Sequence, residues 1–313
     1  MSGCSGCASY RRCSAPPSGQ QAELPPLLSQ TGLFSAAAAD PANADTQPYA
    51  PAFALWSDGA SKQRWIQLPA GSRIDTSNMD DWSFPVGTKF WKEFSRGGRR
   101  IETRLLVRVG PAANDWAGAA YLWDTDQRDA RLAPEGRRDA DGAGHDVPSA
   151  ADCNGCHGGR RSHVLGFSAQ QLAQPGVPLS LDALARRGWL THAPEHPPSI
   201  PGNDSERAAL GYLHANCGHC HNRQRPARGD GPRCYDPERS IDFWLPLNPE
   251  GAAAEMPAVK TTVPRYVTPG DPDDSRLMSL VSRRGARLHM PPLGSQQVDP
   301  DGVARLRAWI EGL

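Results

Sequence analysis

The sequence has no apolar run close to the roughly 20 residues of a transmembrane helix, and it has no excess of charge of either sign. Its 313 residues include 34 Lys and Arg and 34 Asp and Glu, so the formal net charge is zero. A chain without a net field has no general attraction for nucleic acid or an anionic membrane surface. We therefore expect no transmembrane helix and no nucleic-acid partner.

An apolar export-signal segment is also missing behind Met1. The tripeptide Ser2-Gly3-Cys4 resembles the end of a lipoprotein signal, and Cys4 would then carry a lipid that anchors the chain to a membrane. The alternative is a leader without an anchor. In both cases residues 1–30, which contain two Pro-Pro pairs, are predicted to be a disordered leader or linker.

Proline and glycine are abundant, with 30 and 31 residues, which indicates short elements joined by many loops. The length allows two domains with a sizeable core. We predict an α+β protein: a β-rich domain over residues 31–133, a segment over 134–202, and a mainly helical domain over 203–313.

Two pentapeptides share the pattern C-x-x-C-H, namely Cys153-Asn-Gly-Cys156-His157 and Cys217-Gly-His-Cys220-His221. This is the arrangement of c-type haem attachment, in which two thiols add to the haem vinyl groups and the next imidazole ligates the iron. Composition alone would supply roughly 0.006 such pentapeptides in a chain of this length. The sequence therefore predicts two covalently bound haem c groups, with His157 and His221 as proximal ligands.

A zinc site built from the two C-x-x-C pairs is the main alternative. Zinc-binding pairs are commonly separated by about 15–20 residues, and Cys156 and Cys217 lie much further apart than that. A four-cysteine site would also leave the two histidines that follow the pairs without a purpose. Haem explains more of the pattern.

Short strand-like runs divided by Gly, Pro and Asp predict an antiparallel β domain, which we interpret as a sandwich. These runs are 62–68, 82–84, 89–94, 101–109 and 119–123. Gly97-Gly98 between two of them predicts a hairpin.

Many of the tryptophans belong to this region, and we expect them to pack in its core. They are Trp56, Trp65, Trp82, Trp91, Trp116 and Trp123. The region also contains a group of charged residues that we interpret as a solvated face. Its members are Lys62, Arg64, Lys89, Lys92 and Glu93.

Helices are predicted from Ser168, from Leu181 to Arg187 with Ser180 as cap, and from about residue 204 into the second motif, with Asp204 or Ser205 as cap. Gly211 would allow another helix to cross closely. A terminal helix from Asp299 to Leu313 presents an apolar stripe. Because the first motif is followed by little chain before the next helix, we expect its haem to take a wall from a neighbouring segment.

The order helix, C-x-x-C-H, proline-rich loop, Met290-Pro-Pro and terminal helix with Trp309-Ile310 resembles a class I cytochrome c domain over residues 203–313. From about residue 25 onward the chain also resembles a family of exported bacterial di-haem c-type cytochromes with a β-rich N-terminal region. The matching segments include 55–62, 82–88, 101–106 and 165–172. This resemblance implies Met290 as the distal ligand of the second haem, and a periplasmic or otherwise exported location.

The sequence leaves the distal ligand of the first haem open. The histidines and methionines that remain as candidates are His145, His163, His192, His196, His214, Met79, Met256 and Met278. The leading functional hypothesis is electron transfer between exported redox proteins. The alternatives are a di-haem peroxidase or oxidase with an open sixth position at the first haem, and a β-domain binding module coupled to a redox output.

Overall fold

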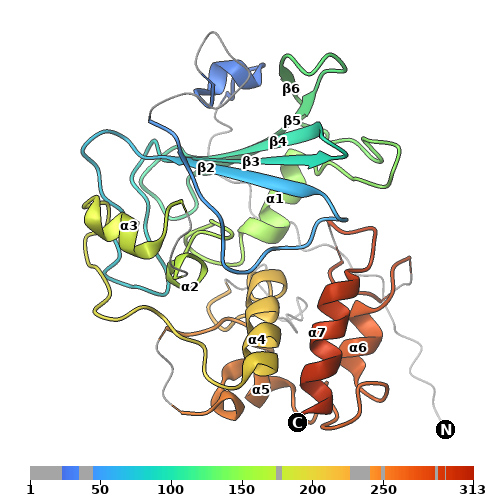
Figure 1. Ribbon diagram of the computed structural model, residues 1–313. Coiled ribbons are helices and arrows are strands. Elements are labelled where there is room, and N and C mark those ends of the chain that lie inside the picture. The colour runs from blue at the N-terminus through green and yellow to red at the C-terminus, as the bar shows by residue number, and fades with distance from the viewer. Residues whose placement is uncertain are drawn as a thin grey trace, which may run out of the picture.

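The computed structural model describes residues 23–34, 45–173, 178–225, 240–247, 251–285, 288–292 and 294–313. It is a mixed α+β structure, with one antiparallel sheet above a group of helices (Figure 1). No helix in these ranges has the length and apolarity that crossing a membrane requires.

The six strands are consecutive neighbours in a single sheet, in the order β1-β2-β3-β4-β5-β6. They are β1 (Gln47–Pro48), β2 (Ser61–Gln67), β3 (Lys89–Arg96), β4 (Arg99–Arg108), β5 (Trp116–Trp123) and β6 (Ala130–Leu132). The predicted sandwich is wrong, because the described strands form one sheet whose two faces are covered by helices and loops. The predicted strand at 82–84 makes only an isolated bridge between Asp75 and Ser83.

The hairpin between β3 and β4 is confirmed. Gly97 and Gly98 have φ angles of 56° and 79°, which two-residue turns matching the twist of a hairpin require at both central positions. Pairing then runs from Lys89 opposite Val107 to Arg96 opposite Arg99, with an irregularity at Phe94 and Ser95.

One face of the sheet, here called the outer face, packs against residues 24–34. Trp65, Trp91 and Tyr121 are buried there against Leu28 and Leu33 of this segment, which includes the short helix η1 (Leu28–Thr31). The Trp91 indole donates a 3.0 Å hydrogen bond to the Thr31 hydroxyl. Within the predicted leader or linker, residues 23–30 therefore belong to the fold, because their leucines complete this core.

The opposite face, here called the inner face, is apolar at one end. Ile66 and Phe90 pack there with Phe84 and Phe167, close to the helix that carries the first motif and to the two helices after it. These helices are α1 (Ala150–His157), α2 (Ala169–Leu172) and α3 (Leu181–Arg186). Ser180 caps α3 as predicted, since its hydroxyl accepts from the Ala183 amide. Trp65, Trp82, Trp91 and Trp123 are buried, which confirms core packing for these four.

The C-terminal part consists of α4 (Asp204–Asn216), η3 (Ala253–Glu255), α5 (Pro257–Thr262), α6 (Arg276–Val281) and α7 (Pro300–Glu311). Its buried side chains, here called the C-terminal core, include Leu210, Leu306, Trp309 and Ile310. Asp299 caps α7 through the Gly302 amide.

Two details of α4 differ from expectation. Its cap is Asn203, whose side chain accepts from the Glu206 amide while Glu206 accepts from the Asn203 amide, so the reciprocal pair outcompetes Asp204 and Ser205. The close crossing of α4 with α7 is made at Gly302, where a Cβ would lie 2.3 Å from the Tyr212 ring. Gly211 instead faces Phe53, which a Cβ would meet at 2.2 Å.

Candidate functional site

The first C-x-x-C-H motif forms the helix α1. Ser149 starts this helix, since its hydroxyl and its amide both interact with the Asp152 carboxylate, at 2.7 and 3.2 Å. Positions three and four apart share one face of a helix, so Cys153, Cys156 and His157 project from the same side of α1.

That side of α1 lies against the inner face of the sheet. The Cys153 sulfur packs beside Gly118 on β5, since a Cβ built at Gly118 would lie in ordinary contact with the sulfur, at 3.7 Å. Desolvation raises the pKa of Cys153, and the Arg104 guanidinium opposes this shift. The sheet thus covers the side of α1 from which the motif cysteines project.

His157 is held as a neutral imidazole in one tautomer. Desolvation, with a further contribution from Lys92, lowers its pKa to about 3. Its Nδ1 lies 2.6 Å from the carbonyl oxygen of His163, and because a carbonyl only accepts, Nδ1 must carry the proton. The lone pair is therefore on Nε2. This is the state of a metal-ligating histidine whose other nitrogen is fixed by a backbone carbonyl.

The second motif forms a tight turn at the end of α4. The amides of Cys220 and His221 both donate to the Cys217 carbonyl, at 3.0 and 2.8 Å. The backbone carbonyl of His221 accepts from the Phe243 amide at 2.9 Å. The His221 and Phe243 rings meet edge to face, with centroids 5.8 Å apart. Burial, followed by the neighbouring Cys220, raises the pKa of Cys217 to about 12.

Met290 lies at the edge of the same C-terminal core that Cys217 borders. Its amide donates to the Leu280 carbonyl at 3.0 Å, and its own carbonyl accepts from the Arg284 guanidinium at 3.1 Å. Arg284 also donates to Ser295, so one guanidinium connects both sides of the Met290 loop. The structure therefore brings the second motif and Met290 to one core.

The two motifs are in direct contact with each other. The Cys220 sulfur lies 3.8 Å from the carbonyl oxygen of Gly155, inside the first motif. The Asn222 amide group donates to the Gly159 carbonyl at 3.2 Å. Gly159 approaches so closely that a Cβ would lie 1.7 Å from the His219 carbonyl oxygen. This contact between the motifs was not predicted from the sequence. Gly159, two residues after the first motif, is a local sign of a close backbone approach there.

A loop over residues 53–60 connects the sheet to the second motif and to the segment after Met290. The Trp56 amide donates to the Asn216 side chain at 2.7 Å, and the Trp56 indole donates to the Gln297 carbonyl at 2.9 Å. One oxygen of the buried Asp58 carboxylate accepts from the amides of Gln296 and Gln297, at 2.8 and 2.7 Å. The loop thus binds both the end of α4, at Asn216, and the segment after Met290, at Gln296 and Gln297.

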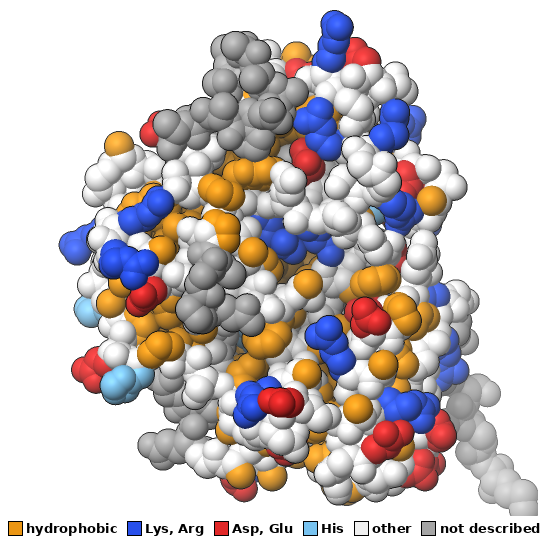
Figure 2. Space-filling view, viewed as in Figure 1, with side chains coloured by type: hydrophobic (Ala, Val, Ile, Leu, Met, Phe, Trp, Pro, Cys, Tyr) orange, Lys and Arg blue, Asp and Glu red, His pale blue; other side chains and the backbone are white. Residues whose placement is uncertain are grey.

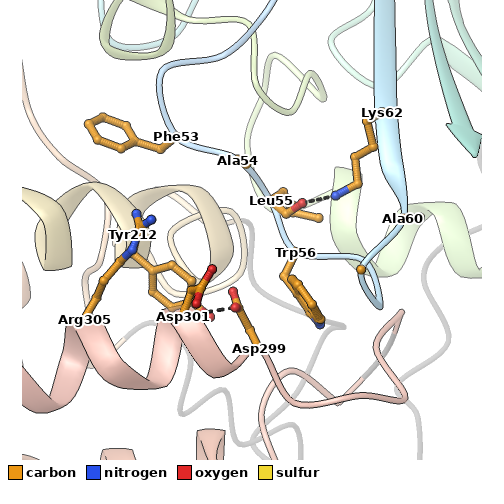
Figure 3. Close-up of a pocket in the computed structure, with 12 residues that line it drawn as sticks. Phe53, Ala54, Leu55, Trp56, Ala60, Lys62, Tyr212, Asp299, Asp301 and Arg305 are labelled. Carbon is orange, nitrogen blue, oxygen red and sulfur yellow. Dashed lines mark hydrogen bonds between the residues drawn. The ribbon is translucent and has the colours of Figure 1, made fainter. Parts of the chain in front are cut away.

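A cavity of about 250 Å³ lies beside this loop, between β2, α4 and α7 (Figure 3). Lys62 and Trp56 line one side, and Asp299 and Arg305 line the other. The Tyr212 hydroxyl is hydrogen-bonded to Asp299. None of the motif cysteines or histidines lines this cavity, which therefore lies outside the candidate site.

The interpretation of the charged group on β2 and β3 as a solvated face is wrong. Glu93 is only 7 % exposed and Arg64 only 8 %. Arg64, Lys92 and Arg104 are directly opposite one another on three neighbouring strands, on the inner face, which α1 covers. Alternation along β3 assigns Lys89 to the outer face instead. A charge count along the chain cannot show which face a helix will cover.

Arg104 is the cation of this row with a carboxylate partner. It makes hydrogen bonds of 2.9 and 2.5 Å with the two oxygens of Glu102. Glu102 also bonds the Nε2 atom of His145 at 2.7 Å. Burial by itself raises the pKa of Glu102, but Arg104 and His145 hold it below its ordinary value.

Several candidates for the distal ligand of the first haem are engaged elsewhere. His145 is bound to Glu102. His214 accepts from the Leu245 amide at Nδ1, and burial lowers its pKa to about 3. The His163 carbonyl accepts from His157 Nδ1, and the His163 ring stacks with the Trp116 ring, with centroids 6.4 Å apart.

The other candidates are dispersed. Met256 and Met278 are buried in the C-terminal core, Met79 packs at the edge of the inner-face core, and His192 and His196 are exposed. The structure therefore brings none of these five into a described contact with His157.

The four motif cysteines are thiols rather than disulfides. In the described part of the chain, no group of three or more His, Cys, Asp or Glu side chains is placed to hold a metal ion. A haem iron takes only two axial protein ligands. Cys4, the predicted lipid anchor, lies outside the described residues.

Comparison of the chain with protein-family models, curated proteins and solved structures found no match.

Proposed function

We propose that the protein is a di-haem c-type cytochrome that transfers electrons between exported redox partners. Cys153 and Cys156 would hold one haem and Cys217 and Cys220 the other, with His157 and His221 as proximal ligands and Met290 as the distal ligand of the second haem. Haem supplies a reversible one-electron iron couple when it is bound. Helices α4 to α7 would then form the cytochrome c-type domain.

The observation that carries the proposal is the contact between the two C-x-x-C-H motifs. Electron tunnelling weakens steeply with distance, so a chain that relays single electrons needs its two attachment sites close together. Here the sulfur of Cys220 contacts the backbone of Gly155. The Asn222 side chain donates to the Gly159 carbonyl, and the Arg225 side chain donates to the Cys220 carbonyl. These contacts set the spacing of the two motifs, and this spacing supports the proposal.

The tautomer of His157 supports the same function. A proton fixed on Nδ1 by the His163 carbonyl leaves Nε2 as the donor atom and prevents rotation of the ring. Rigid donors are suited to electron transfer, because little has to move between the two oxidation states. Protein groups around the site then set the reduction potential.

The test is a haem analysis of protein produced in a host that attaches haem c. We expect two haems per chain by pyridine haemochrome assay and intact mass, one per chain in Cys153→Ser/Cys156→Ser, and one in Cys217→Ser/Cys220→Ser. Cys234→Ser is the matched control and keeps both haems. A wild-type chain without covalent haem would overturn the proposal.

Ligation decides between the electron carrier and the enzyme alternative. Two low-spin ferric haems in absorption and EPR spectra, with a weak near-infrared band from Met-to-iron ligation, are the expected result. A high-spin first haem that binds carbon monoxide or peroxide would instead favour a peroxidase or oxidase, since the sixth position would then be open.

A further inference from the structure

We propose that Arg64 and Lys92, on the inner face of the sheet, bind the propionate carboxylates of the haem attached at Cys153 and Cys156. This inference rests on the proposed function and adds a second, electrostatic part to its first site. The sheet would then be a haem-binding element and not only a support for α1.

Strand pairing brings these charges together. Arg64 of β2 is opposite Lys92 of β3, which is opposite Arg104 of β4. Like charges directly opposite each other in a sheet are destabilising. Glu102 compensates Arg104. Among the described residues, no ion pair is found for Arg64 or Lys92.

Arg64 is buried without full hydrogen bonding. Arg64 is only 8 % exposed, and its Nε atom has no hydrogen-bond partner in the described structure. Arg64 and Lys92 line one small cavity, which is closed by Gly166 behind the first motif and by Ala215 just before the second. A buried charge without a partner costs several kcal/mol, so an anion is expected in this position.

The position of the cations fits the chemistry of the porphyrin. The cysteines take the vinyl-bearing edge, and the two propionates lie on the opposite edge. Cys153 packs at Gly118 of β5. Strands are about 4.8 Å apart, so β3 and β2 lie about 10 and 14 Å from β5 across the sheet. Carboxylates at the far edge would therefore lie towards Lys92 and Arg64 rather than towards Arg104.

Figure 2 shows Lys and Arg side chains gathered near the centre of the displayed face, between the sheet and the helices. Positive charge near a haem favours its reduced form, because reduction adds one negative charge. The cations should therefore raise the potential of the first haem above that of the same site without them.

The experiment compares Lys92→Met and Arg64→Met in the full haem-loaded protein. The matched control is Lys89→Met, which removes the same charge from β3 on the outer face. Lys92→Arg and Arg64→Lys keep the charge. Haem content is measured first, then the two midpoint potentials by EPR-monitored titration, then the propionate bending band by resonance Raman spectroscopy.

We expect each methionine variant to keep two haems and to shift the oxidised-to-reduced ratio of the first haem about tenfold towards oxidised, equivalent to about 59 mV for one electron. The propionate band should shift in both variants. The second haem, the control and the charge-keeping variants should stay close to wild type.

Other results would overturn the inference. If haem content is normal and neither the potential nor the Raman band changes, the cations do not bind propionates, while the electron-transfer proposal stands. If added chloride or phosphate sets the potential, the cations hold a diffusible anion. If the charge-keeping variants shift the potential as much as the methionine variants, packing rather than charge is responsible. By contrast, loss of the first haem in Lys92→Met and Arg64→Met, with normal haem in Lys92→Arg and Arg64→Lys, would support binding of the propionates by these charges.

Discussion

The two C-x-x-C-H motifs share a sequence pattern and lie in contrasting surroundings. The first lies on α1 under a row of cations, with Glu102 and His145 close behind. The second lies at the end of α4, beside an apolar core that Met290 also borders. Under the proposed function, the same pattern would give two haems of different reduction potential, because burial, nearby charge and axial ligand tune the potential of a haem.

Glu102→Gln, near the first motif, should produce the largest loss of stability. Removing the carboxylate leaves Arg104 buried without its partner, which should cost about 3–5 kcal/mol in the free energy of unfolding. Denaturant titration measures this. Glu255→Gln, at an exposed helical position, is the control and should change stability by less than about 0.5 kcal/mol. A small effect in Glu102→Gln would show that Arg104 relaxes into water.

The same carboxylate gives a pH signature. The pKa of Glu102 is lower in the folded protein than its ordinary value. Its stabilising contribution is therefore present above the unfolded pKa, near about 4.3, and is lost as the pH falls through the folded value. Unfolding of the wild type measured from pH 6 to pH 2 should show this loss, and Glu102→Gln should show a flatter acid limb. Parallel curves would contradict the assignment.

Gly159→Ala would disrupt the contact between the two motifs. The new Cβ would meet the His219 carbonyl oxygen, a backbone atom that cannot rotate away. Overpacking of this kind costs about 1–3 kcal/mol, and we expect the upper end of that range with slower electron exchange between the haems. Gly312→Ala, where a Cβ has ordinary contacts at 3.6 Å, is the control. Unfolding and flash-reduction kinetics give the two readouts.

Asp58→Ala should destabilise the segment after Met290, near the second motif. Two backbone amides of the segment after Met290 would lose a charged acceptor, at about 1.5–3 kcal/mol. We also expect the near-infrared methionine band to disappear at a lower temperature than in wild type. Asp58→Asn keeps an oxygen acceptor and tolerates the positive φ of 53°, so it should lose less. Equal losses in both variants would point to charge rather than hydrogen bonding.

Met290→Leu should have the smallest effect on stability, below about 1.5 kcal/mol, since the volume is nearly conserved. Its spectroscopic effect should nevertheless be complete, with loss of the methionine band and a lower potential for the second haem alone. Met278→Leu makes the same change inside the C-terminal core and should leave the band unchanged. A band that survives in Met290→Leu would assign the distal ligand elsewhere.

Local patterns predicted much of this structure. The Gly97-Gly98 hairpin, the Ser180 cap and the terminal helix after Asp299 follow from rules that act within a few residues. The cap of α4 was missed by one position, because Asn203 and Glu206 form a reciprocal pair that neither Asp204 nor Ser205 can match.

By itself, the sequence determined the two C-x-x-C-H motifs and most of the strands and helices near them, since spacing and alternation are local properties. Only the tertiary structure decided that the sheet is single, that Arg64 and Lys92 face inward, and that the two motifs touch at Gly155 and Gly159. These features depend on which surfaces cover one another. Coverage is set by packing between segments far apart in the chain, and no short pattern records it.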